Sequence, residues 1–79
     1  MLTLVLDGEG SLNLQVYKAL RGAILTGQLE ANSRLSSSRA MAKDLNVSRN
    51  TVLFAYDQLI SEGYCIAREG SGTFISSEV

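Results

Sequence analysis

The stretch DLNVSRNTVLFAY, residues 44–56, limits what this chain can fold into more than any other part of it. One apolar helical pattern ends at Leu45, Asn46 interrupts it, and a second pattern begins at once with Ser48. Serine favours helix N-termini because its side chain accepts a hydrogen bond from a backbone N–H of the first turn. A helix that starts so soon after another projects at a steep angle, with its own first turn uncovered. The stretch therefore predicts two helices joined by a tight turn.

Apolar spacing and capping residues predict three helices, over roughly residues 12–26, residues 38–45 and residues 48 to about 62. The residues expected to cap or close them are Ser11 or Asn13, Gly27, Ser37, Ser48 and Gly63. After the third helix, the runs 64–67 and 73–75 flank a glycine-containing loop and predict a β-hairpin. The expected fold is therefore mainly α with a small β-hairpin.

These elements together predict one winged helix-turn-helix domain, in which the hairpin is the wing. The domain is expected over residues 11–76, preceded by an arm or short strand over residues 1–10. Residues 77–79 are expected to be a tail or the start of a linker. With 79 residues, 46% of them apolar, the chain can form one small packed core.

The third predicted helix has an apolar face and a polar face. At 100° per residue, four apolar residues lie within about 80° of Val52, namely Ala55, Tyr56, Leu59 and Ile60. The residues of the opposite face are Asn50, Phe54, Asp57 and Ser61. The first face is expected to pack on the core. Phe54 is the exception on the outward face, and it either packs beneath the hairpin or marks a protein interface.

The charges are unevenly distributed along the chain. Residues 33–56 contain four basic residues and one acid, whereas the rest of the chain contains three basic residues and seven acids. A basic region on an otherwise acidic body is expected where one surface meets a polyanion. An ordinary solvated surface gives the same count, so the charges alone leave both interpretations open.

The composition argues against several classes of protein. A single cysteine excludes an internal disulfide, and without any histidine there is no zinc site. The same lack of histidine, and of carboxylates paired at a plausible site, predicts that the chain is not an enzyme. No apolar stretch has the length of a membrane span, and no signal peptide is evident, so a cytoplasmic location is expected.

The first turn of the third helix carries side chains suited to DNA, because an α-helix fits the major groove and its first turn reaches base edges. Ser48 can bind phosphate, and Arg49 can contact guanine or the backbone. Asn50 can pair with adenine, and Thr51 offers a hydroxyl and a methyl group. Ser48 also caps the helix without DNA, and Thr51 can simply pack. In the wing, glycines allow close backbone approach to a second surface, with Arg68 at its base.

The stretch LSSSRAMAKDLNVSRNTVLFAYDQLISEGYCIAREGSGTFIS, residues 35–76, resembles the DNA-binding domain of GntR-type bacterial transcription regulators, and most of all the MocR/PdxR subgroup. The resemblance implies sequence-specific binding to a double-stranded operator, with the third helix, 48–62, in the major groove. It places the wing, 68–73, along the backbone or minor groove. In that subgroup such a domain precedes an aminotransferase-like domain that binds pyridoxal phosphate, so a cofactor and an effector are expected only in an attached C-terminal domain. The resemblance also allows a homodimer.

Carried over residue by residue, the resemblance implies DNA contacts from the SSR motif, the VSRNTV motif and the wing. The expected DNA-binding residues are Ser38, Arg39, Ser48, Arg49, Asn50, Thr51, Arg68 and Gly70. Two glycines of the family pattern are replaced here by Asn32 and Asn46. Asparagine is the non-glycine residue that best tolerates the left-handed region, so the turns are expected to keep their shape. Alternative functions are a winged helix used for protein association and the front end of a pyridoxal-phosphate-dependent, aminotransferase-like sensor.

Overall fold

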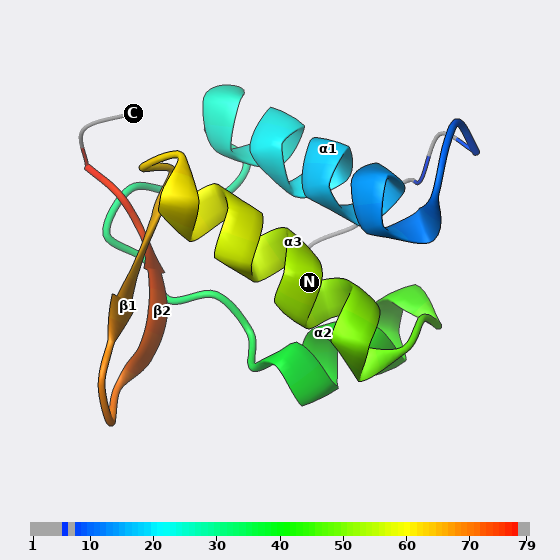
Figure 1. Cartoon of the computed structure of the whole chain (residues 1–79). Helices are drawn as coiled ribbons and strands as arrows, with labels where there is room; N and C mark the ends of the chain where they lie inside the picture. The colour runs from blue at the N-terminus through cyan, green and yellow to red at the C-terminus, as the bar shows by residue number, and fades with distance from the viewer. Residues whose placement is uncertain (1–5, 7, 78–79) are drawn as a thin grey trace.

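The computed structural model describes residue 6 and residues 8–77 of the chain. Its elements are the helices α1 (Leu12–Leu25), α2 (Ser38–Leu45) and α3 (Arg49–Ser61), followed by strands β1 (Cys65–Arg68) and β2 (Gly72–Ile75). Figure 1 shows α1 along one side of α3, α2 near the N-terminal end of α3, and the hairpin near its C-terminal end. The tip of the hairpin points toward the same side of the molecule as α2. The winged helix-turn-helix predicted from the sequence is confirmed.

The predicted arm or strand over residues 1–10 lies mostly outside the described residues. Leu6, which is described, is partly buried and packs against the core. None of the helices within residue 6 and residues 8–77 is long and apolar enough to cross a membrane.

Each helix begins with a serine cap. The side-chain oxygens of Ser11, Ser37 and Ser48 accept hydrogen bonds from the backbone N–H groups of Leu14, Ala40 and Thr51, respectively, at 3.1–3.2 Å. Each bond satisfies one of the N–H groups that the first turn of a helix leaves without an intrahelical partner. Two of these caps match the prediction, and the structure selects Ser11 over Asn13 for α1.

Asparagine makes the turn between α2 and α3 possible. Asn46 adopts the left-handed conformation, with φ of 57°, and the backbone N–H of Val47 then bonds to the carbonyl of Ala42 at 3.0 Å. Asn32, in the loop before α2, also has a positive φ of 69°. The prediction that asparagine keeps both turns in the left-handed region is therefore confirmed.

The core lies between α1 and α3 and is closed by α2 and the hairpin. The apolar face predicted for α3 is buried apart from Ile60, which is only partly buried, and Val52, Ala55 and Leu59 are fully enclosed. The other members of the core cluster are Val16, Tyr17, Leu20, Ile24, Leu35, Met41, Ala42, Tyr56, Cys65 and Ile75. Contacts from all three helices and both strands reach this cluster, so the orientation of α3 is fixed along most of its length.

A third segment pairs with the two strands of the wing, and the sequence pattern did not indicate it. The segment 32–35 runs along the free edge of β2, where the N–H of Leu35 bonds to the carbonyl of Thr73 at 2.8 Å. The N–H of Ile75 bonds to the carbonyl of Ser33 at 2.9 Å, and Arg34 pairs with Phe74 as an isolated bridge. These hydrogen bonds connect the loop that leads into α2 to the wing, and through this loop they connect the wing to the helices.

A polar cluster joins α1 to the C-terminal end of α3. The Tyr17 hydroxyl donates to the carboxylate of Glu62, and Gln58 Nε2 donates to the same carboxylate at 3.1 Å. Arg21 donates to the Tyr17 hydroxyl at 3.3 Å and lies over the Tyr17 ring, 5.2 Å from its centroid. The bond from Tyr17, followed by the bond from Gln58, lowers the pKa of Glu62 below its usual value.

We expect the Tyr17→Phe variant to be less stable than the wild type at neutral pH, because it loses the donor to Glu62. A carboxyl group with a lowered folded-state pKa stabilises the fold above its unfolded-state pKa, about 4.3 for glutamate, and loses this effect as the pH falls through the folded-state value. The stability difference between the two proteins should therefore shrink between pH 7 and pH 3 in urea unfolding. The control is Tyr64→Phe, and an equal pH dependence for both variants would contradict this role of Glu62.

We expect Asn46→Ala to lower the free energy of unfolding by about 1 kcal/mol, the cost of a left-handed backbone for a residue with an ordinary side chain. Asn46→Gly should be no less stable than Asn46→Ala, since glycine adopts this conformation freely. Asn13→Ala, in α1, is a control with the same change of side chain in a helix. Chemical unfolding measures all three variants, and a smaller loss for alanine than for glycine at residue 46 would refute the explanation.

Candidate nucleic-acid interface

The outward side of the first turn of α3 is exposed, as the sequence predicted. Arg49 and Asn50 both lie on the surface. Ser48 accepts the bond from the Thr51 N–H, and its hydroxyl also lies 2.9 Å from the Thr51 Oγ1. The backbone N–H groups at the very start of the helix have no intrahelical partner, and they carry the positive end of the helix dipole. The turn therefore offers an open, positive surface to an anion.

Arg49 links the first turns of α3 and α2. Its Nε donates to the Ser38 side-chain oxygen at 3.0 Å, and both side chains belong to the predicted DNA-binding set. The bond uses Nε, which leaves the two terminal nitrogens of the guanidinium group available for other contacts. Because one nitrogen is held, the planar group has a defined orientation, which favours bidentate contacts with a base or a phosphate.

A buried tyrosine sets the position of α2 relative to α3. The Tyr56 hydroxyl, on the apolar face of α3, donates to the backbone carbonyl of Ser36 at 2.7 Å. Burial raises the pKa of Tyr56 well above its usual value, so the hydroxyl remains a donor over the physiological range. The bond fixes the segment just before α2, and with it the distance between the two helix N-termini.

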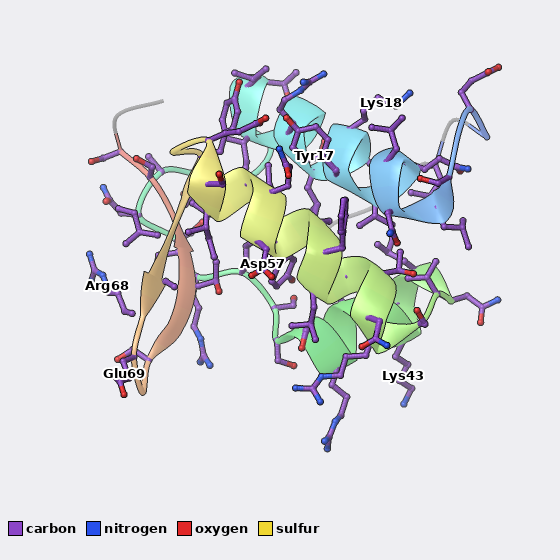
Figure 2. All side chains as sticks on the ribbon, viewed as in Figure 1. Tyr17, Lys18, Lys43, Asp57, Arg68 and Glu69 are labelled. Atoms are coloured by element: carbon purple, nitrogen blue, oxygen red, sulfur yellow. The ribbon has the colours of Figure 1, made fainter. Side chains whose placement is uncertain are left out.

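Basic side chains and the wing tip project on the same side of the molecule. Arg39 and Lys43 are exposed on α2, and Figure 2 shows Lys43 extending from the side toward which the wing tip also points. Glu69 lies at that tip, whereas Lys18 extends from α1 on the opposite side (Figure 2). The two helix N-termini and the wing therefore gather exposed basic side chains on one side of the molecule, with the acid Glu69 at the wing tip.

Arg68 and Thr51, two further members of the predicted set, also have partners within the fold. Arg68 places its guanidinium group over the ring of Phe74, 4.9 Å from the centroid, on the side of the hairpin away from α3 (Figure 2). Thr51 is only 8% exposed and bonds to the helix cap, as its packing alternative predicted. Direct DNA contacts by these two residues stay predictions. Gly70 has a φ of +79° and open space beside it, as a wing tip that approaches a second surface requires.

Phe54 is not packed beneath the hairpin, which was one of the two alternatives for it. Its side chain is 50% exposed, and its neighbours on the outward face of α3 are exposed as well. The prediction of packing failed because the hairpin closes over the apolar face of α3, through Cys65 and Ile75, rather than over its outer face.

Arg34 belongs to this surface, although the sequence analysis did not single it out. Its guanidinium group lies beside Gly72, where a Cβ atom would sit 2.8 Å from the Arg34 Nε. Gly72 also has a φ of +113°, a backbone conformation that residues with a side chain rarely adopt, so glycine suits this position. Both residues line a groove of about 180 Å³ between the wing and the start of α2. No local pattern could reveal this, because the two residues meet only through the pairing of the segment 32–35 with β2.

The comparisons with known proteins agree with this geometry. Residues 12–75 match the model of the family described as bacterial regulatory proteins, gntR family. The chain is 48% identical over 77 residues to the probable rhizopine catabolism regulatory protein MocR of Rhizobium meliloti, covering 98% of this chain and 16% of that protein. It is 39% identical over 69 residues to the pyridoxine biosynthesis transcriptional regulator PdxR of Corynebacterium glutamicum. This match covers 87% of this chain and 15% of that protein. The chain thus spans about a sixth of the length of these relatives.

Solved structures show the same fold. YtrA from Sulfolobus acidocaldarius, a GntR-family transcription factor, aligns with a TM-score of 0.85 and 27% identity, over 98% of this chain and 81% of that one. A GntR family transcriptional regulator from Listeria monocytogenes aligns with a TM-score of 0.85 and 26% identity. This alignment covers 91% of this chain and 63% of that one. With the family match over most of its length, the chain belongs to the gntR family of bacterial regulatory proteins and is a winged-helix DNA-binding domain of a transcription regulator.

Proposed function

We propose that this domain recognises a specific operator by inserting the first turn of α3 into the major groove, while the wing follows the backbone or minor groove. The observation that carries the proposal is the exposed first turn of α3, held to the first turn of α2 by the bond from Arg49 to Ser38. A helix N-terminus of this kind combines unpaired N–H groups with reach to base edges.

The residues divide into two roles under this proposal. Arg49 and Asn50 read bases, since a guanidinium group matches guanine and a carboxamide matches adenine. Ser38, Arg39 and the wing tip contact the sugar-phosphate backbone and set the register of the helix in the groove. The remaining members of the set are Ser48, Thr51, Arg68 and Gly70. Of these, Thr51 acts through Ser48, because it is buried and bonds to that cap.

The domain itself acts by binding, and we propose that it has no enzymatic activity and works in the cytoplasm. Its relatives are named as regulators. Lys18 and Lys43 are its only lysines, and neither lines the groove between the wing and the start of α2, so these residues do not suit pyridoxal phosphate, which requires a lysine for its Schiff base. We therefore assign any cofactor or effector site to a further domain of the regulator, and a homodimer stays a prediction.

We expect Arg49→Ala to weaken binding to the preferred operator by about 1–3 kcal/mol, the usual value of a bidentate base contact, and to relax the preference at one base pair. Arg49→Lys should recover the part of the affinity that does not depend on DNA sequence, because lysine keeps the positive charge. It should not recover the preference at that base pair, since lysine lacks the planar guanidinium group. The operator can be selected from random DNA, and fluorescence anisotropy then gives the affinity of each variant.

The control is Lys18→Ala, which also removes one positive charge but from the opposite side of the molecule (Figure 2). Its affinity should stay close to that of the wild type, and wild-type binding should weaken as salt rises from about 50 to 200 mM. Equal losses of binding affinity for Arg49→Ala and Lys18→Ala would contradict the proposed base contact by Arg49. Failure of the wild type to prefer any selected DNA would end the proposed function.

A further inference from the structure

Phe54 exposes an aromatic side chain that the fold does not use. It lies on the outward face of α3, opposite the buried residues, and is 50% exposed. The other residues of that face, Asn50, Asp57 and Ser61, are also exposed and are polar. An exposed phenylalanine on an otherwise polar face adds little to folding. Such a side chain is better explained by a role in binding.

The position of Phe54 relative to Asn50 fits the spacing of base pairs. Residues four apart in a helix lie on the same face, about 6 Å apart along the axis. This rise corresponds to between one and two base pairs, at about 3.4 Å each. A helix that places Asn50 against an adenine therefore places Phe54 over a neighbouring base pair.

The reading surface of α3 ends just after Phe54. Asp57 follows within the next turn, and Figure 2 shows it on the middle of the helix. A carboxylate at this point is repelled by the phosphates that line the groove. The outward face therefore begins with the carboxamide of Asn50, continues with the aromatic ring of Phe54, and becomes acidic at Asp57.

We propose that Phe54 contacts the C5-methyl group of a thymine in the major groove, beside the base pair that Asn50 reads. Thymine is the only unmodified base with an apolar group in the major groove, and an aromatic side chain recognises it by excluding water. The inference rests on the proposed function and adds a specificity-determining residue to it. A protein partner is the less suitable occupant, because a stable interface needs a larger apolar area than Phe54 and the adjoining Leu53, which is 37% exposed, provide.

The test uses the operator selected from random DNA and replaces its thymines one at a time with deoxyuridine, which lacks only the methyl group. We expect the wild type to lose about fourfold in affinity at one thymine, the value of burying one methyl-sized group. Phe54→Ala should bind the thymine and deoxyuridine forms equally at that position, while keeping its sensitivity to the base pair read by Asn50.

The matched control is Leu25→Ala, which removes another exposed apolar side chain, 59% exposed at the end of α1. This variant should keep the full thymine dependence, and unfolding curves for both variants show whether the fold is intact. A wild type that binds its operator but is indifferent to every thymine-to-deoxyuridine change would overturn the inference and leave DNA binding standing. Thymine dependence that persists in Phe54→Ala, together with a loss of self-association in sedimentation, would instead assign Phe54 to a protein contact.

Discussion

The left-handed turn at Asn46 is the constraint on which the rest of the structure depends. It ends α2, directs the backbone of Val47 back to the carbonyl of Ala42, and allows α3 to start at Arg49. With a longer connection, the first turn of α3 would not be held beside that of α2, and the bond from Arg49 to Ser38 would not form. One residue with a tolerated positive φ therefore positions the whole candidate interface.

Helix α3 has two tasks, and its sequence separates them by face. The buried face, around Val52 and Leu59, holds the helix in the core, and Tyr56 adds a hydrogen bond that fixes the approach to α2. The outward face carries no packing role and is therefore open to a ligand. Rigid support on one side is what allows a few side chains on the other to be presented at a defined spacing.

Features governed by neighbouring residues were predictable from the sequence. The serine caps, the bounds of α2 and the buried face of α3 agree with the predictions, because hydrogen bonding in a first turn and helical periodicity act over only a few residues. The exposure of Arg49 and Asn50 followed for the same reason. The sequence left the environment of Phe54 open, because periodicity shows on which face of a helix a residue lies but not what packs against that face.

The sequence by itself determined the order of the elements, the tight turn and the residues of the reading helix, since each depends on local backbone and capping preferences. Only the tertiary structure decided that Arg34 lies against Gly72, that Arg68 stacks on Phe74, and that Thr51 is buried. The first two contacts join residues that are distant in the chain or belong to different strands. The contact between Arg34 and Gly72 arises when the segment before α2 pairs with the wing, and the contact between Arg68 and Phe74 arises when β1 pairs with β2. No local preference specifies these pairings.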